Sequence, residues 1–276
     1  MKKQIVFITG ASSGIGKETA LKLLQEGHTV YGAARRIDKM QALTDAGGYA
    51  LQMDILQAQQ VQAAVDKIIE AEGRIDVLIN NAGYAVFGAV EDVSAEDARR
   101  QFDVNLFGLA EVTKQVLPHM RRQKSGRILN ISSMGGKLYS PLGAWYHATK
   151  HALEGWSDCL RLETKQFGID VVIIEPGIIK TELGDVMLAP MLERSGKGPY
   201  TGLAQKLALA TDRSYSRSKN YSPASVIAQV ISKAIRARKP KTRYAKGKYA
   251  KPLMWMRLYL VDRLFDKVVM SQFQLK

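Results

Sequence analysis

Residues 5–16 read Ile5-Val6-Phe7-Ile8-Thr9-Gly10-Ala11-Ser12-Ser13-Gly14-Ile15-Gly16, in which an apolar run leads into three glycines spaced Gly-x-x-x-Gly-x-Gly. The run is typical of a buried strand, and a helical pattern follows it. Glycines let the backbone turn tightly and approach a pyrophosphate, while the N-terminus of the next helix presents unpaired N–H groups. The stretch therefore predicts a dinucleotide-binding loop. The alternative is a tight strand-to-helix turn that binds nothing.

The same alternation of strand and helix continues along the chain. Apolar runs indicate buried parallel strands at 5–9, 29–33, 49–53, 77–80, 127–131 and 170–174. Helical patterns cover 15–26, 59–72, 94–122, 145–167 and 222–238, the last with Ser222 as N-cap and Pro223 as first residue. The pattern predicts an α/β fold, a Rossmann-type doubly wound parallel sheet in a single domain of residues 1–276. Segment 185–221 is expected to form a substrate flap, and 240–276 a basic, helical C-terminal extension.

Composition narrows the class of protein further. The single cysteine, Cys159, excludes an internal disulfide and a cysteine-rich zinc site. None of the four histidines (His28, His119, His147, His151) has metal-ligand spacing, and His147 and His151 are expected to be surface or packing residues of a helix. The first apolar run is too short for a signal peptide, and no run approaches the roughly 18 residues of a membrane span. We expect a cytoplasmic protein without a metal.

The net charge of +14 is concentrated at the C-terminus. Residues 233–276 hold 13 Lys and Arg against 2 Asp and Glu, whereas the first 232 residues carry a net charge of only +3. Aromatic and aliphatic residues alternate with these cations over 252–269, a combination that can make peripheral contact with an anionic membrane surface. The alternative is a C-terminal helix that covers the substrate pocket or a subunit interface. No nucleic-acid recognition motif accompanies the charge.

Two arginines follow the second expected strand. A fold that selects NAD usually has an acid at this point, to hold the ribose hydroxyls. Here Arg35 and Arg36 follow Ala33-Ala34 instead, and an arginine can pair with a 2′-phosphate. The sequence favours NADP(H), with NAD(H) as the second choice. Surface charges that open a helix are the other interpretation.

A Tyr-x-x-x-Lys spacing supplies the candidate chemistry. Tyr146 and Lys150 share one face of a helix, so the ammonium is expected to favour the phenolate and lower the pKa of Tyr146. Such a tyrosine exchanges a proton with an alcohol or carbonyl oxygen. Ser132 and Ser133 compete to hold that oxygen, since only one of two neighbours on a strand faces the site.

These motifs together resemble the classical short-chain dehydrogenases/reductases over about residues 4–182. They occur in the family's order: the loop 9–16, Asp54, Asn80-Asn81-Ala82-Gly83, Asn105, Ser133, Tyr146-His147-Ala148-Thr149-Lys150, and Pro176-Gly177 with Thr181. The interval to Tyr146, as in the family, selects Ser133. The C-terminal region resembles the bacterial 17β-hydroxysteroid dehydrogenase-like and retinol dehydrogenase-like branch.

The resemblance implies a role for each residue. Tyr146 would be the general acid/base, Lys150 would lower its pKa and bind the nicotinamide ribose, and Ser133 would bind the substrate oxygen. Asn105 would hold a water of a proton relay. Cofactor contacts would come from Gly10, Ser12, Ser13, Gly14, Ile15, Gly16, Arg35, Arg36, Asp54, Ile55, Asn81, Ala82, Gly83, Tyr146, Lys150, Pro176, Gly177 and Thr181.

The expected function is NADP(H)-dependent interconversion of an alcohol and a ketone or aldehyde. The substrate is expected to be apolar and steroid-, retinoid- or lipid-like, because two segments place apolar side chains near the site: Leu138, Tyr139, Leu142 and Trp145 in one, Leu183, Val186, Met187, Leu188, Met191 and Leu192 in the other. Packing of these residues on the protein body is the alternative. The family implies homo-oligomers. A non-enzymatic NADP(H) sensor and an NAD-preferring alcohol dehydrogenase are the competing functions.

Overall fold

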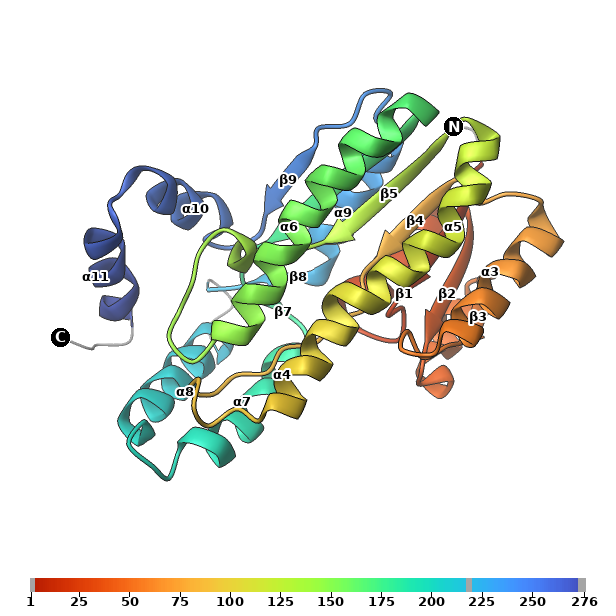
Figure 1. Ribbon diagram of the computed structural model, residues 1–276. Helices are drawn as coiled ribbons and strands as arrows, with labels where there is room; N and C mark the ends of the chain where they lie inside the picture. The colour runs from red at the N-terminus through yellow and green to blue at the C-terminus, as the bar shows by residue number, and fades with distance from the viewer. Residues whose placement is uncertain (1–2, 217–219, 273–276) are drawn as a thin grey trace.

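The computed structural model describes residues 3–216 and 220–272, without side-chain detail for 183–186 and 214–216. Seven strands of the described chain form a parallel sheet in the order β3-β2-β1-β4-β5-β6-β9 (Figure 1). They are β1 Ile5–Thr9, β2 Thr29–Ala34, β3 Tyr49–Gln52, β4 Val77–Asn80, β5 Gly126–Ile131, β6 Ile169–Pro176 and β9 Arg243–Lys246. The order reverses between β1 and β4, which places a crevice at their carboxyl ends. The predicted doubly wound α/β fold is confirmed.

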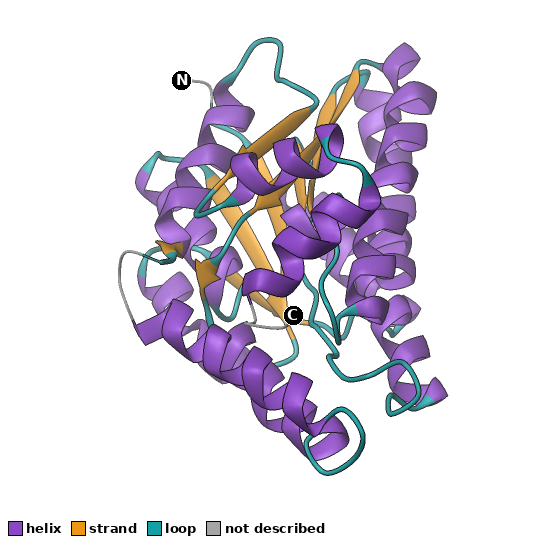
Figure 2. Ribbon diagram, turned by 90° about the vertical axis from the view of Figure 1, so that its left-hand side faces the viewer, coloured by secondary structure: helices purple, strands orange, loops and turns teal. Residues whose placement is uncertain are grey.

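Helices cover both faces of this sheet (Figure 2). Alternate residues of β1 face opposite sides: Val6 and Ile8 join one apolar core, and Ile5 and Phe7 join the other. The first core is covered by α1 Gly14–Gln25, the short η1 Ile37–Met40 and α2 Gln41–Asp45, and α9 Ala224–Arg236. The second core is covered by α3 Ala58–Glu72, α5 Leu109–Gln123 and α6 Ala144–Thr164, and α6 continues into η4 Lys165–Phe167. Both faces are therefore buried, as the continuous apolar strands predict.

Three expectations about the elements need correction. The helix expected at 94–122 is interrupted: α4 Ala95–Phe102 and α5 are joined by a π-helical turn, η2 Asp103–Gly108, although the Ser94 cap is confirmed by a 3.0 Å bond from the Asp97 N–H to its Oγ. Ser222–Pro223 forms a short strand, β8, paired with β7 Ile179–Lys180, and Pro223 is itself the N-cap of α9. Strand β9 was not predicted.

The segments beyond residue 180 are more helical than their composition suggested. The expected flap contains α7 Glu182–Ser195 and α8 Thr201–Ser216, which pack on Phe87, Ala89 and Leu142. At the C-terminus, α10 Ala250–Tyr259 and α11 Asp262–Gln272 pack on the segment that follows β5, which begins with η3 Met134–Gly136 (Figure 1). Within the described residues, we find no helix with the length and apolarity needed to cross a bilayer.

A ladder of buried polar side chains crosses the middle of the sheet from α5 to α6. Asn80 Nδ2 donates to Thr113 Oγ1 and to Asn130 Oδ1, both at 2.9 Å. Asn130 Nδ2 in turn donates to Ser157 Oγ at 2.8 Å. These four side chains are at most 1% exposed, so each depends on the next for its hydrogen bonds.

We expect Asn130→Ala to lower the free energy of unfolding by about 1–3 kcal/mol, because it removes one buried hydrogen bond from Asn80 and one from Ser157. Urea unfolding at equilibrium measures the change. The matched control is Asn220→Ala, which removes one exposed 3.3 Å bond to the Arg213 carbonyl and should change the value by less than about 0.5 kcal/mol. Equal losses in the two variants would contradict the ladder's role.

Candidate active site

The glycine loop joins β1 to α1 at the carboxyl edge of the sheet. Gly10 and Gly14 have φ of 67° and 53°, a left-handed conformation that favours glycine. A Cβ at Gly16 would lie 2.3 Å from the Gly10 carbonyl oxygen, so only glycine fits there. Ser12, Ser13 and Ile15 are half-buried in the same turn, and Ser13 is the N-cap of α1. The loop therefore has the compact backbone and helix N-terminus that an anion site needs.

The end of β4 locks this loop in place. Asn81 Nδ2 donates to the carbonyls of Thr9 and Gly10 at 3.1 and 3.0 Å. The Thr9 hydroxyl accepts bonds from the N–H groups of Asn81 and Ala82, both at 3.1 Å. Gly83 follows, against the Asn105 side chain. The predicted cofactor residues of the first and fourth strands are thus brought together.

The residues after β2 and β3 lie around the loop's outer side. Arg35 and Arg36 are both exposed, and Arg36 Nη2 is 3.5 Å from Ser13 Oγ and 3.2 Å from Glu182 Oε2. The Arg36–Glu182 pair is half-exposed and therefore weak. Asp54 Oδ1 accepts the Leu56 N–H at 3.0 Å, which shapes the turn after β3, and Ile55 beside it is buried.

The chain returns to the loop after β6. A Cβ at Gly14 would lie 3.2 Å from the Thr181 methyl carbon, and a cavity of about 440 Å³ opens beside these two residues. Gly177 donates its N–H to Lys246 at 2.8 Å, and a Cβ there would meet the Lys248 carbonyl at 2.2 Å. The unpredicted strand β9 therefore supports the corner of Pro176 and Gly177.

Ser133 and Tyr146 meet at the mouth of the crevice. The Ser133 side chain caps η3 by accepting the Gly135 N–H at 3.0 Å, and its hydroxyl lies close enough to the Tyr146 hydroxyl to lower the pKa of that group. The rival Ser132 is buried, and its Oγ has no hydrogen-bond partner. Tyr146 lies on the first turn of α6 with its ring 5.6 Å from that of Phe87. The structure thus pairs Ser133, not Ser132, with Tyr146.

Burial sets the protonation of the Tyr-x-x-x-Lys pair. Burial raises the pKa of Tyr146 above its usual value, and the nearby Ser133 hydroxyl offsets only part of that shift. It lowers the pKa of Lys150 to about 8, with a partly compensating attraction from Glu154. Lys150 Nζ donates to the Ile131 carbonyl at 2.9 Å. The pKa of Tyr146 is therefore raised in this structure and not lowered as expected, because desolvation is the largest contribution and Lys150 is not among the groups that shift it.

Asn105 ties the loop after β4 to α6. Its Oδ1 accepts the Tyr84 N–H at 3.0 Å, and its Nδ2 donates to the Tyr84 carbonyl at 2.8 Å and to Thr149 Oγ1 at 3.2 Å. Thr149 lies next to Lys150. The π-helical turn places Asn105 at this point, since an insertion of this kind locally redirects a helix.

His147 has a positioning role that its sequence did not reveal. Its Nε2 accepts the Ser140 N–H at 3.0 Å, so Nδ1 carries the proton and donates to the Gly135 carbonyl at 2.9 Å. Burial lowers the pKa of His147, which keeps the ring neutral. The ring therefore pins both ends of segment 135–140 to α6. Its place directly after Tyr146 was the only available signal.

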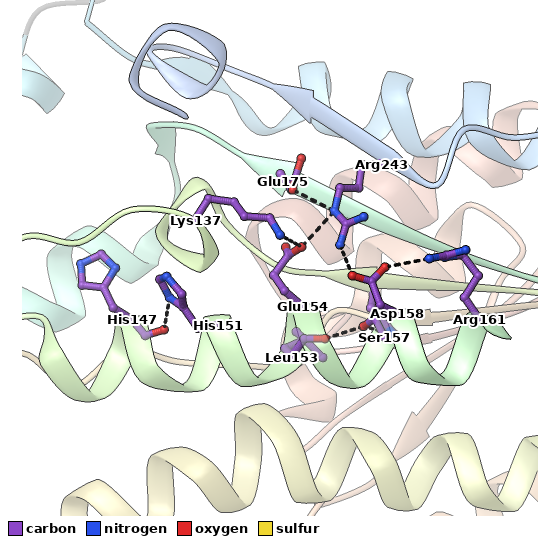
Figure 3. Close-up of polar contacts among 11 residues, drawn as sticks. Lys137, His147, His151, Leu153, Glu154, Ser157, Asp158, Arg161, Glu175 and Arg243 are labelled. Atoms are coloured by element: carbon purple, nitrogen blue, oxygen red, sulfur yellow. Dashed lines mark hydrogen bonds and ion pairs between the residues drawn. The ribbon is translucent and has the colours of Figure 1, made fainter. Parts of the chain in front are cut away.

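A network of charges extends from α6 to β9 (Figure 3). Glu154, one turn after Lys150, pairs with Lys137 at 3.1 Å and with Arg243 at 3.2 Å. Arg243 also lies 3.5 Å from Glu175, and burial together with the charge of Glu154 raises the pKa of Glu175 to about 7. Figure 3 shows Lys137 and Arg243 reaching Glu154 from separate elements. Sequence reasoning missed this network because its members are far apart in the chain.

The apolar residues predicted near the site divide between several contacts. Leu142, Met187, Leu188, Met191 and Leu192 gather in one cluster with Tyr146 and Phe87. Trp145 packs with Val86 and Val93, and Leu138 and Tyr139 pack against the C-terminal helices. The side chains of Leu183 and Val186 lie outside the described residues. Only part of the predicted lining therefore faces Tyr146.

Comparison with known proteins places this geometry in a family. A family profile described as short chain dehydrogenase matches residues 4–189. A 3-ketodihydrosphingosine reductase of Bacteroides thetaiotaomicron is 42% identical over 189 residues, 67% of each chain. A probable short-chain type dehydrogenase/reductase, VdlC, of Helicobacter pylori is 35% identical over 96% of this chain and 97% of the relative.

Solved structures agree with the sequence relatives. The crystal structure of a short-chain dehydrogenase from Streptomyces avermitilis matches with a TM-score of 0.78 and 30% identity, covering 99% of this chain and 97% of that one. The match extends across the sheet and both helical layers described above. The chain belongs to the short-chain dehydrogenase family and is an oxidoreductase that interconverts alcohol and carbonyl groups with a nicotinamide dinucleotide.

Proposed function

We propose that the chain is an NADP(H)-dependent oxidoreductase that interconverts an apolar alcohol and its ketone or aldehyde. The observation that carries the proposal is the proximity of the Ser133 and Tyr146 hydroxyls, with the buried ammonium of Lys150 on the same helix as Tyr146. These three groups lie at the carboxyl edge of the sheet, where ligands of open α/β folds bind. They give one substrate oxygen two hydroxyl partners and place a cation one helical turn away.

The residues at this edge fit a dinucleotide. The backbone around Gly10 and Gly16 is so close that a Cβ would collide with it, and the α1 N-terminus has no side-chain cap. The bound cofactor supplies the hydride chemistry. We assign the pyrophosphate to the loop 10–16, the adenosine side to Asp54, Ile55 and 81–83, and the nicotinamide side to Tyr146, Lys150, Pro176, Gly177 and Thr181.

The choice of NADP(H) rests on charge. β2 ends in Ala34 with no acid after it, and Arg35 and Arg36 are both exposed at the loop's outer side. Arg36 lies beside Ser13, where a 2′-phosphate next to the pyrophosphate would accept its hydrogen bonds. Its weak pair with Glu182 leaves the guanidinium available. An NAD-preferring enzyme is the alternative.

The protonation states favour Tyr146 as proton donor to a carbonyl. Its raised pKa keeps the hydroxyl protonated at neutral pH, the form required when reduction puts negative charge on the substrate oxygen. The Ser133 hydroxyl holds that oxygen. Lys150 has a pKa of about 8 and is mostly charged at neutral pH. It therefore supplies a buried positive charge one turn along α6 when Tyr146 becomes a phenolate. Asn105 and His147 keep the flanking loops in place.

Apolar surroundings support a lipid-like substrate. Tyr146 packs in a cluster with Phe87, Leu142 and Met191, and α7 and α8 supply the remaining members. We take α7 and α8 as the substrate flap of a single domain. The Bacteroides relative is named for 3-ketodihydrosphingosine, a long-chain ketone, which agrees with an apolar wall. We also infer a cytoplasmic homo-oligomer that binds no nucleic acid.

Tyr146→Phe is expected to lower the rate of ketone reduction by about 10²- to 10⁴-fold while NADPH still binds, because only the proton donor is removed. NADPH oxidation with 3-ketodihydrosphingosine, a steroid ketone and retinal measures the loss. Tyr49→Phe, an exposed tyrosine on β3, is the matched control and should keep full activity. NADPH binding without turnover of any carbonyl by the parent protein would favour the sensor instead.

Arg36→Ala is expected to lower kcat/KM for NADPH about tenfold or more and to leave the value for NADH nearly unchanged, since one charge-assisted hydrogen bond contributes about 1.5 kcal/mol. Lys39→Ala, an exposed cation one turn along, should change neither value. Steady-state kinetics with NADPH and with NADH measure kcat/KM for each cofactor in the parent and in both variants. A parent enzyme that prefers NADH would show that the interpretation of the arginines is wrong.

Glu154→Gln is expected to move the alkaline limb of the pH profile to lower pH. Lys150 loses its charge as pH rises through about 8, and Glu154 raises that pKa, so its removal lowers the pH at which charge is lost. The measurement is kcat/KM for ketone reduction against pH. Asp158→Asn, which alters the same network two turns from Lys150, should leave the limb in place. A limb that stays near pH 8 in Glu154→Gln would rule out Lys150 as its source.

A further inference from the structure

The C-terminal helices α10 and α11 expose a compact group of large apolar side chains. Within ten residues, five such side chains are 47–73% exposed: Trp255, Leu258, Tyr259, Val261 and Leu264, named here the docking face. Trp255 and Tyr259, one turn apart, are in contact with their rings tilted by 46° and the centroids 5.0 Å apart. Single exposed apolar residues are ordinary, but a contiguous group marks an interaction surface.

The opposite side of these helices is firmly packed. Phe265 and Val269 are buried against Leu138, with Leu253 and Met256 of α10 in the same cluster. Arg257 lies over the rings of Tyr139 and Phe265 at 5.2 and 5.7 Å. The docking face is therefore the outer side of a fixed element, which Figure 1 shows at the edge of the molecule beyond the sheet.

Charge distinguishes between partners for this face. Both acids of residues 233–276 are engaged internally: Asp262 pairs with Arg257 at 3.0 Å, and Asp266 accepts the Tyr139 hydroxyl at 2.9 Å. Lys251, Arg263 and Lys267 are exposed and have no ion pair among the described residues. The segment therefore presents positive charge around an apolar centre.

We propose that the docking face inserts shallowly into an anionic lipid bilayer and passes a membrane-borne substrate to Ser133 and Tyr146. Tryptophan and tyrosine favour the interfacial zone, aliphatic side chains enter the acyl region, and lysine and arginine bind acidic headgroups. A second copy of the chain would bring two strongly positive segments together, which is unfavourable. Exposed leucine and valine have no partner on a nucleic acid backbone.

The position of the face supports the delivery of substrate. The α10–α11 pair packs directly on Met134, Leu138 and Tyr139, the residues that follow Ser133. The α10–α11 pair therefore connects a bilayer held against the docking face with the loop that borders the site. This second step rests on the proposed function, whereas docking itself does not.

Co-sedimentation of the full chain with vesicles tests the docking. We expect binding to vesicles of phosphatidylcholine mixed with phosphatidylglycerol and at least about tenfold weaker binding to phosphatidylcholine alone. Trp255→Ser/Leu258→Ser, and separately Lys251→Gln/Arg263→Gln/Lys267→Gln, should each weaken binding at least about tenfold. Leu162→Ser, which removes a 66% exposed leucine from α6, is the matched control and should bind like the parent. Circular dichroism checks that each variant is folded.

Turnover measured beside binding separates the two steps. NADPH-dependent reduction of vesicle-borne 3-ketodihydrosphingosine should fall in Trp255→Ser/Leu258→Ser, while reduction of the water-soluble cyclohexanone stays at the parent rate. Unchanged reduction of the vesicle-borne ketone would overturn delivery. Vesicle binding with no turnover of either ketone by the parent would overturn the proposed function and leave docking supported.

Three further results would overturn docking: a parent chain that ignores anionic vesicles, a double variant that binds them equally well, or a double variant that changes only the oligomeric state in size-exclusion chromatography. Binding of duplex DNA that competes fully with vesicles and is unaffected by the double variant would assign the charge to nucleic acid instead, and would also overturn docking.

Discussion

The hydrogen bond from the Lys150 ammonium to the Ile131 carbonyl joins the candidate chemistry to the sheet. Ile131 ends β5, and Lys150 lies one turn after Tyr146 on α6, so this bond fixes the helix against the strand at the carboxyl edge. It also keeps the ammonium buried, and burial is what lowers the pKa of Lys150 to about 8. The same burial raises the pKa of Tyr146. One packing constraint thus moves the two pKa values apart, that of Lys150 down and that of Tyr146 up.

Helix α6 carries most of the side chains that depend on this constraint, and each holds a different part of the molecule. Tyr146 lies close to the Ser133 hydroxyl, His147 holds segment 135–140, and Glu154 pairs with Lys137 and Arg243. Buried carboxylates need such partners, because an unpaired charge in the interior is costly. Since Arg243 belongs to β9, which also supports Gly177, the last third of the chain contributes to the geometry of a site whose motifs lie in the first two thirds.

The sequence was sufficient wherever structure follows from local pattern, and insufficient wherever it depends on distant partners. The six predicted strands are confirmed, since buried apolar runs have few other conformations available. Strand β9 was not predicted because its sequence, Arg243-Tyr244-Ala245-Lys246, is short and basic, as edge strands often are. The π-helical turn at Asn105 breaks no local rule, and the Glu154–Arg243–Glu175 network joins three separate elements. The error over the Tyr146 pKa has the same origin: a helical spacing shows that a cation is near but not how deeply both groups are buried.

The segment after Ser133 lies between two anchors of different character. On its inner side, His147 fixes the backbone with two hydrogen bonds. On its outer side, Leu138 and Tyr139 pack on α10 and α11, which are attached to the sheet through β9 and expose their far side. A change at His147 would displace Ser133 and so affect the chemistry. A change in α10 or α11 would instead alter the residues that surround segment 135–140. Differences in this C-terminal extension could therefore adjust which substrates reach the site without altering Ser133, Tyr146 or Lys150. This is how one fold accommodates many substrates.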